Sequence, residues 1–385
     1  MRDGLKKLSC APSGPDGRPR DLLRDQRGAI MVMGVFMAVL LVGMIYYVSG
    51  IGETILYRER MQDASDAGAF AAAVMHARGM NIIALLNMIM AAVLAVLVAL
   101  KIVHFLLAAA TIVATIICAW CAAFGSGCWA CGPAVLLEVA REEVAAVIDS
   151  VEPTIENIVS IAHGVSVGVR EGYPIAAQAK VIEYGAYTYD EPTTAGFMYP
   201  FYESLPTEDD DSDLLCRKAG EEAAVLLVPL PFGGIIRPFV SPATGSLAAT
   251  FSSYFCGDSA DKAQRVIEDA ELGDENFQVR AFMIGDPPFE RGEQGVAVAA
   301  WGQRDDSAIV DGLRELGRVS FAQAEFYYAD GDADRREWMW HMEWTARLRR
   351  FRLPSDMDGI GAVCGGGGGC AALGTISGVR DVVVH

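Results

Sequence analysis

Charged side chains are scarce in this chain, and basic ones are scarcer than acidic ones. Of the 385 residues 21% are charged, and 31 Lys and Arg oppose 49 Asp and Glu, for a formal net charge of −18. Hydrophobic residues make up 52% of the chain. This excludes an intrinsically disordered chain, because such chains combine low hydrophobicity with dense charge. The acidic balance also argues against nucleic acid as a partner, because nucleic-acid-binding proteins carry basic surfaces.

The sequence also lacks several patterns that carry enzyme chemistry. No Gly-x-Gly-x-x-Gly loop for a dinucleotide is completed, and the five histidines show no metalloprotease spacing. We therefore expect a chain with no catalytic residue, no cofactor and no bound metal.

The first apolar run, residues 29–52, carries no charge and follows a basic tail, residues 1–28, with several Gly and Pro. A transmembrane helix needs about 20 consecutive apolar residues, so the run predicts a membrane span in contact with lipid. Tyr46 and Tyr47 near its far end are typical of a membrane interface. Because basic residues favour the cytoplasmic side, we expect the flexible tail in the cytoplasm.

A second apolar run extends from Ile82 to Phe124 and is interrupted by Lys101. As one helix it would be about 60 Å long, twice the thickness of the hydrocarbon layer. Asn87 and His104 also lower its apolar character. Two interpretations stay open: two membrane spans that turn near Lys101, or a long helix that packs against protein.

The segment between these runs is rich in alanine and contains no proline, which predicts a helix. Ala64, Ala67 and Ala71 recur at helical spacing. We expect this small-residue face to let another helix approach closely.

The same part of the chain resembles a known family. Arg27–Gly28 opens the first apolar run, Tyr57–Arg58 follows it, and residues 62–73 read QDASDAGAFAAA. Together these features resemble the N-terminal module of TadE/TadG-like proteins, over roughly residues 25–100. That family comprises pilin-related components of the bacterial Flp (tight-adherence) pilus assembly system. The resemblance implies a protein anchored in the inner membrane, with a periplasmic or surface-exposed C-terminal domain. It also implies a homo- or hetero-oligomer with other pilus-assembly subunits.

Cysteine placement favours disulfides. Of the nine cysteines, Cys10 lies in the tail and an even set of eight follows the first apolar run, as expected for an oxidising compartment. Two Cys-x-x-Cys pairs flank residues 124–127. Two nested disulfides between the pairs would join the two arms of a helical hairpin. A zinc site and a redox pair at Cys118 and Cys121 stay open as alternatives. The disulfide candidates, in their expected pairs, are Cys118 with Cys131, Cys121 with Cys128, Cys216 with Cys256, and Cys364 with Cys370.

The sequence as a whole predicts an α+β fold. We expect long N-terminal helices, followed by a mixed domain of helices and strands outside the cytoplasm. We place a pilin-like helical region at 53–132, a second helical region at 133–192 and the outer domain at 193–385. Pro153 would begin or break a helix. Expected strands cover 224–228, 235–240, 277–284, 295–301 and 347–353.

Two side-chain clusters in the outer domain draw attention. The acidic run Glu208–Asp211 with Asp213 would hold calcium or, as the favoured interpretation, form a solvated loop. Trp338, Trp340, Trp344 and Arg349 belong to an aromatic and basic cluster. Such residues form either an interaction surface or a pair of core strands with outward-facing arginines.

The leading hypothesis is therefore a non-enzymatic, membrane-anchored, pilin-like component of a pilus assembly or secretion system. The alternatives are a membrane-tethered periplasmic enzyme using thiol redox chemistry, and an unrelated protein with several membrane spans.

Overall fold

The computed structural model describes residues 26–123, 131–185, 195–200, 203–210, 214–227, 255–256, 262–267, 277–284, 319–331, 333–334 and 337–350. The chain divides into two compact units, one formed by Met1–Glu59 with Pro287–Asp305 and the other by Arg60–Asp286 with Asp306–His385. The described residues of the first unit, 26–59, are entirely helical. The second unit contains both sheets and the other helices.

Helix α1 (Gln26–Ala123) is continuous over 98 residues. It contains no proline and is rich in Ala, Leu and Met, which are among the strongest helix formers. Of the two interpretations left open for this region, the one with two spans that turn near Lys101 is wrong, because the helix runs through this residue. The Lys101 ammonium instead lies 2.6 Å from the Glu152 carboxylate and donates to the Phe255 carbonyl at 3.1 Å. The helix packs against protein as far as Lys101.

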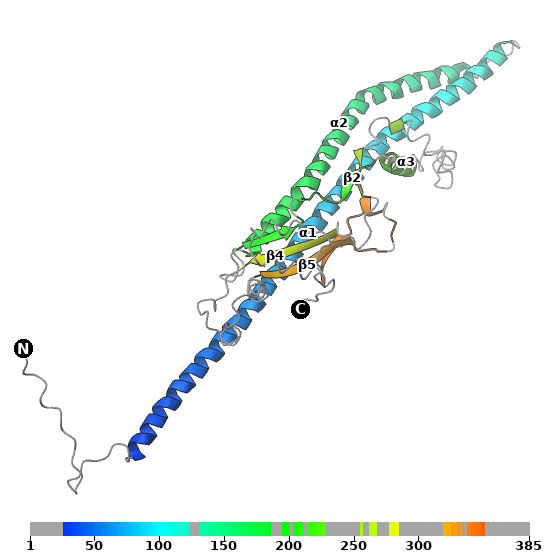
Figure 1. Ribbon diagram of the computed structural model, residues 1–385. Coiled ribbons are helices and arrows are strands. Elements are labelled where there is room, and N and C mark those ends of the chain that lie inside the picture. The colour runs from blue at the N-terminus through cyan, green and yellow to red at the C-terminus, as the bar shows by residue number, and fades with distance from the viewer. Residues whose placement is uncertain are drawn as a thin grey trace, which may run out of the picture. The chain divides into compact units, whose positions relative to one another are not determined.

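Helix α2 (Cys131–Glu183) follows and lies beside the second-unit part of α1 (Figure 1). The sequence predicts a break or a start at Pro153, but both Pro153 and Pro174 lie inside the helix. A proline inside a helix removes one backbone hydrogen bond and bends the axis. Figure 1 shows that α2 bends along its length.

The main sheet has four antiparallel strands in the order β1-β4-β5-β6. Its register places Phe282 opposite Phe321 and Tyr328 opposite Trp344. Strands β2 and β3 form a separate antiparallel pair. The strands are β1 (Ala195–Tyr199), β2 (Thr207–Asp209), β3 (Gln264–Val266), β4 (Gln278–Ile284), β5 (Val319–Tyr328) and β6 (Trp344–Arg349). Long helices followed by antiparallel sheets are compatible with the expected α+β class.

Two expected strands have counterparts, since 277–284 matches β4 and 347–353 overlaps β6. The strand expected at 224–228 is wrong, because helix α3 (Leu214–Leu227) covers this segment. Leu215, Ala219 and Ala223 recur every four residues in α3 and are fully buried, so helical packing decides the local structure. The strands expected at 235–240 and 295–301 lie outside the described residues.

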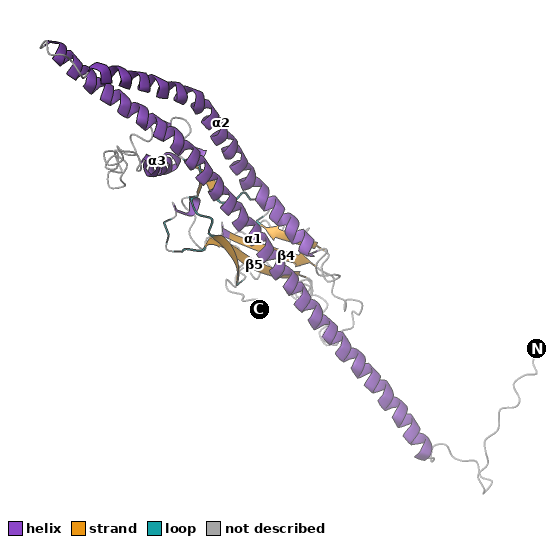
Figure 2. Ribbon diagram, turned by 180° about the vertical axis from the view of Figure 1, so that it is seen from behind, coloured by secondary structure: helices purple, strands orange, loops and turns teal. Residues whose placement is uncertain are grey.

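The main sheet rests against the helices of the second unit (Figure 2). Two hydrogen bonds fasten β5 to α1. The Ser320 hydroxyl donates to the Met61 carbonyl at 2.7 Å, and the Gln62 amide donates to the Phe321 carbonyl at 3.2 Å.

A hydrophobic core separate from the main sheet lies where α1, α2 and α3 meet. Leu94 and Leu97 of α1, Val159 of α2 and Leu215 of α3 are at most 2% exposed. Buried apolar surface at this junction stabilises the fold by roughly 1.5–3 kcal/mol per large side chain.

Candidate functional site

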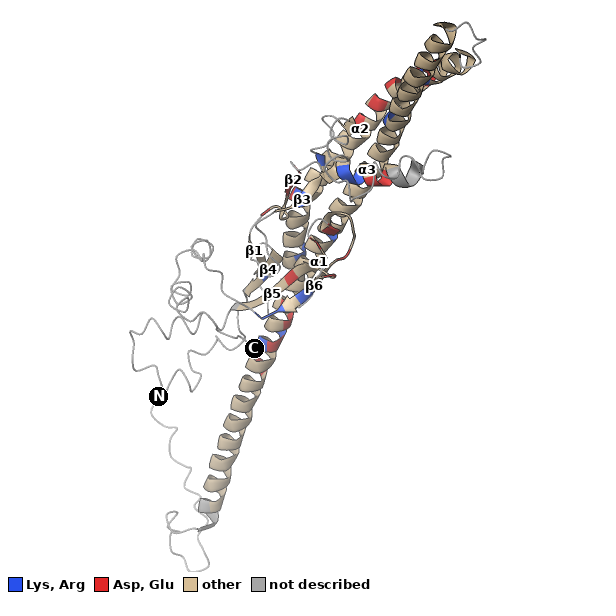
Figure 3. Ribbon diagram, turned by 90° about the vertical axis from the view of Figure 1, so that its right-hand side faces the viewer, with Lys and Arg blue, Asp and Glu red and all other residues tan. Residues whose placement is uncertain are grey.

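The N-terminal part of α1 presents a continuous apolar surface. Every side chain from Ile30 to Ser49 is exposed, including Ile30 at 75% and Val42 at 67%. Figure 3 shows no charged residue along this part of the helix. Among the described residues one helix, Ile30–Ala123, is long and apolar enough to cross a membrane by length and composition. An exposed surface of this kind marks contact with a membrane or with another protein.

The small-residue face of α1 differs from the expected one. Ala64 is fully buried, whereas Ala67 and Ala71 are only half-buried. The inward face includes Gly68, where an added Cβ would lie 2.7 Å from the Met283 Cε atom of β4. Met283 of β4 and Val181 of α2 both approach Gly68, so the chain's own sheet and second helix cover this inward position, and the expected packing role of Ala67 and Ala71 stays a prediction.

Helix α1 also holds the edges of both sheets through asparagine side chains. The fully buried Asn87 donates to the Gln264 carbonyl of β3 at 2.8 Å and accepts from the Gln264 amide at 3.2 Å. Asn81 makes the same pair of bonds with the backbone of Trp344 in β6, both at 3.0 Å. Each side chain thus pairs with a strand as a neighbouring strand would, and this protects an edge from pairing with other chains.

Helix α2 protects the opposite edge of the main sheet. The Gln178 side-chain oxygen accepts from the Met198 amide of β1 at 2.8 Å. Both edge strands, β1 and β6, are therefore fastened to helices by amide side chains. The sequence carries one signal for these contacts, a polar Asn87 inside an apolar helical run, but it gives no indication of the partner strands.

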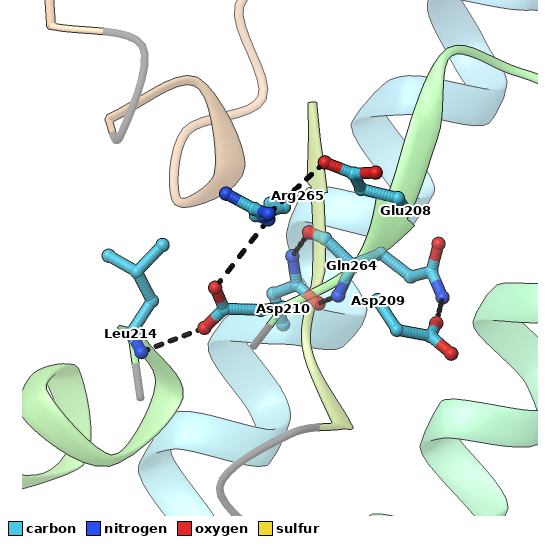
Figure 4. Close-up of polar contacts among 7 residues, drawn as sticks. Glu208, Asp209, Asp210, Leu214, Gln264 and Arg265 are labelled. Carbon is cyan, nitrogen blue, oxygen red and sulfur yellow. Dashed lines mark hydrogen bonds and ion pairs between the residues drawn. The ribbon is translucent and has the colours of Figure 1, made fainter. Parts of the chain in front are cut away.

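The described residues of the acidic run, 208–210, have structural contacts (Figure 4). Asp210 is fully buried and accepts from the Leu214 amide at the first turn of α3, at 2.7 Å. Arg265 of β3 lies 3.2 Å from the Glu208 carboxylate and 3.9 Å from that of Asp210. A solvated loop is therefore wrong for Asp210, which caps α3 and fixes it to β3. Asp211 and Asp213 lie outside the described residues.

The three tryptophans expected at an interaction surface are buried. Trp338, Trp340 and Trp344 are 2%, 7% and 5% exposed. Trp338 and Trp344 meet edge to face, with ring centroids 5.6 Å apart. Since aromatic side chains bury large areas in the core, this part of the surface interpretation is corrected in favour of core packing.

Arg349 lies on the outer side of this core. It is an exposed residue of β6, and its guanidinium Nε binds the carboxylate of Glu325, which is 1% exposed. Arg347 donates to the same Glu325 oxygen at 3.2 Å and stacks on the Tyr327 ring at 4.3 Å. The arginines therefore neutralise a buried carboxylate, which would destabilise the fold if it were left unpaired.

Two of the expected cysteine pairs are joined. Cys118 and Cys131 form a disulfide between α1 and α2, with Cα atoms 5.0 Å apart. Cys216 and Cys256 form a second one, with Cα atoms 5.9 Å apart. Cys121 has no disulfide partner among the described residues. Of the other candidates, Cys128, Cys364 and Cys370 lie outside the described residues.

His76 is buried where α1 meets the sheet. Its ring stacks on Phe326 with centroids 5.2 Å apart, and its Nδ1 atom lies 2.8 Å from the Ala72 carbonyl oxygen. Burial lowers the pKa of His76 to about 4, against the weaker opposing effect of this backbone contact. The imidazole is therefore neutral at physiological pH and serves as an apolar packing element.

One string in α2, residues 164–168, fits the Gly-x-Ser-x-Gly pattern of hydrolases, although no catalytic serine is expected from the sequence. Hydrolases place this serine on a sharp turn between a strand and a helix. Ser166 instead lies inside α2, is fully buried, and donates to the His163 carbonyl at 2.8 Å. Residues 164–168 are therefore part of a regular helix and do not form the turn that presents a catalytic serine.

Within the described ranges, no group of three or more His, Cys, Asp and Glu residues could hold a metal ion. Comparison with protein-family models, curated proteins and solved structures finds no match to this chain. The candidate site is therefore defined by its own geometry: an exposed apolar helix that continues into a folded body.

Proposed function

We propose that this protein is a non-enzymatic, membrane-anchored, pilin-like component of a pilus assembly or secretion machine. Residues 29–52 would lie in the bacterial inner membrane, the tail in the cytoplasm, and the body in the periplasm or at the cell surface. Its partners would be membrane lipid and other subunits of the machine.

The observation that carries this proposal is the continuity of α1. The helix whose side chains are exposed and apolar from Ile30 to Val48 is the same helix that supplies the buried Ala64, Met80 and Leu94. A chain of this design couples its membrane anchor directly to its folded body.

The disulfides add support for a body outside the cytoplasm. Cys118–Cys131 and Cys216–Cys256 both lie beyond the anchor, and structural disulfides persist in oxidising compartments. The thiol-redox alternative gains no support from the pairing, because Cys118 is bonded to Cys131 instead of Cys121.

The proposal is tested in the bacterium that encodes the chain. We expect deletion of the gene to abolish sheared surface filaments or the secretion of their subunits, and the wild-type gene to restore them. Val39→Arg combined with Val42→Arg would fail to restore them, because the anchor no longer fits the bilayer. Ile161→Arg is the matched control, since Ile161 is 68% exposed on α2 and outside the anchor.

Topology is tested separately by adding protease to spheroplasts. We expect the body to be digested while a cytoplasmic marker stays intact. Normal filaments in the deletion strain, or a body protected together with the marker, would contradict the proposal.

A further inference from the structure

The reversing end of the α1–α2 hairpin carries no charge. No Asp, Glu, Lys or Arg occurs between Lys101 and Glu138. We define the hairpin tip as residues 112–123, the last turns of α1, and residues 131–137, the first turns of α2. Figure 3 shows only uncharged residues at this end of the helices.

The tip exposes apolar side chains in almost every direction. From Ile112 to Ala123, only Ala114, Cys118 and Cys121 are half-buried, and every other side chain of α1 is exposed. These three positions lie on one side of the helix, and Cys118 bonds to α2 there. On the other arm, Leu136 is 72% exposed.

This distribution favours lipid over a protein partner. A protein groove covers one stripe of a helix and leaves a polar outer face, whereas a helix that is apolar all round is surrounded by core or membrane. Ile112 at 60% and Val135 at 64% are as exposed as side chains of the expected anchor, such as Val35 at 59%.

The first charges on α2 limit how deep the tip can enter. Glu138 pairs with Arg141, and Glu142 and Glu143 follow. Glu138 lies about 10 Å along α2 from Cys131, at about 1.5 Å per residue. The disulfide holds Cys131 beside Cys118, so charge begins at this depth on one arm. One leaflet contributes about 15 Å of hydrocarbon, so the tip is too short to span the bilayer.

We propose that the hairpin tip is a second membrane contact of this protein, a wedge that inserts into one leaflet of a lipid bilayer. The inference goes beyond the proposed function, because it holds whether or not the chain belongs to a pilus machine. The tip of a second copy is the competing occupant, and the experiment separates the two.

Tryptophan fluorescence tests the proposal in the full chain. Trp120 belongs to the tip and is 67% exposed, the segment 29–52 contains no tryptophan, and Trp338, Trp340 and Trp344 are buried in the core. The other two tryptophans, Trp129 and Trp301, lie outside the described residues and are replaced by phenylalanine in every sample. The chain is reconstituted into vesicles of brominated phosphatidylcholine. In a second arm it is reconstituted into unbrominated vesicles, and brominated vesicles are then added. We expect quenching in at least one arm, stronger with bromine near the headgroup end of the acyl chain than near its methyl end.

Three variants make the result decisive. Trp120→Phe should lose part of the quenching because it removes a reporter, and Leu136→Asp should reduce it because a carboxylate resists insertion. Ile161→Asp, at an equally exposed position of α2 away from the tip, should be quenched like the wild type.

Equal quenching of the wild type and Trp120→Phe in both arms would overturn the proposal. So would stronger quenching from the methyl end, or cross-linked dimers that Leu136→Asp abolishes without any change in quenching.

Discussion

Two asparagine side chains, Asn81 and Asn87, join α1 to the sheets at single positions, and each uses both its donor and its acceptor. Asn87 is the more enclosed of the two, with contacts to the Gln264 amide and carbonyl. Replacing it by leucine would leave two backbone groups of an edge strand without partners in a buried place. We expect Asn87→Leu to lower the free energy of unfolding by about 2–4 kcal/mol, measured by denaturant titration of the full chain in detergent.

Asn81 provides the matched control, because its bonds to Trp344 have the same form but the side chain is only half-buried. In Asn81→Leu, water can form hydrogen bonds with the Trp344 backbone groups that lose their partner, so this variant should lower the free energy of unfolding by only about 1 kcal/mol. Equal costs for the two variants would show that the enclosure of the contact does not decide its contribution.

A second residue-scale prediction concerns pH. The folded-state pKa of His76, about 4, lies below the unfolded value of 6.5, so the unfolded chain binds the proton more tightly. The contribution of His76 to stability is complete above pH 6.5 and is lost as the pH falls toward 4. Over this interval the free energy of unfolding should fall by about 3 kcal/mol through this group. His76→Phe should remove that part of the slope, and an unchanged slope would contradict the prediction.

At the scale of elements, close approach between α1 and α2 depends on Gly79. A Cβ added there would lie 2.7 Å from the Leu205 Cδ1 atom and 3.0 Å from the Tyr173 Cγ atom. Although alanine favours helices, we expect Gly79→Ala to destabilise the protein by about 1–2 kcal/mol through overpacking. Gly164→Ala in α2 meets nothing within 4 Å and should instead stabilise it by about 0.5–1 kcal/mol. Thermal unfolding of both variants tests the pair, and a shift of the same sign in both would refute the steric argument.

We expect one disulfide to stabilise the whole folded body and the other to stabilise only the hairpin tip. Cys118–Cys131 closes a short loop at the hairpin tip, whereas Cys216–Cys256 spans 40 residues and joins the core formed by α1, α2 and α3. Replacing Cys216 and Cys256 by alanine should lower global stability by about 3–4 kcal/mol. Replacing Cys118 and Cys131 should speed hydrogen exchange at the tip and leave β5 protected. Faster exchange throughout the body in the second variant would contradict this division.

Sequence patterns identify helical content better than they identify the boundaries of elements. Residues 29–123 read as two apolar runs and an alanine-rich link, but no proline separates them and they form one helix. A turn at Lys101 stayed open as one interpretation because the charge interrupts an apolar run, and the partner that accommodates it, Glu152, is 51 residues away and is not visible to local patterns. Strand β5 was missed although residues 322–326 alternate apolar and polar side chains, as expected for a strand with one face in water. Gln323 and Glu325 are instead buried, because both faces of β5 are covered.

The candidate site shows the same limit. The exposed apolar part of α1 follows directly from composition, since an uncharged run of this length has few other uses. The tryptophan cluster could be read as surface or core, and only cross-strand pairing, with Trp344 opposite Tyr328, decides for the core. Asn87 stands out as a polar residue in an apolar run, but Asn81 and Gln178 show no such signal, and the partners of all three are backbone atoms of strands distant in sequence.

At the scale of the whole molecule, one helix, α1, supplies both the proposed anchor and part of the folded body, and these two parts of the helix face different surroundings. From Ile30 to Val48 the side chains of α1 are exposed, whereas from Met61 to Val98 one face is buried against protein. Damage to the anchor should therefore change where the protein resides without unfolding its body.

This separation gives the last prediction. Val39 and Val42 are each 67% exposed near the middle of the apolar segment. An arginine at the centre of a transmembrane helix costs about 2.5–3.5 kcal/mol, so replacing both valines should cost roughly 5–7 kcal/mol of insertion. We expect the double variant to leave the carbonate-resistant membrane fraction, with the near-ultraviolet circular dichroism of its buried tryptophans unchanged. The matched variant Ile161→Arg should remain in the membrane. Because the hairpin tip enters only one leaflet, it cannot replace the anchor, and a double variant that resists carbonate extraction would show that residues 29–52 are not the span.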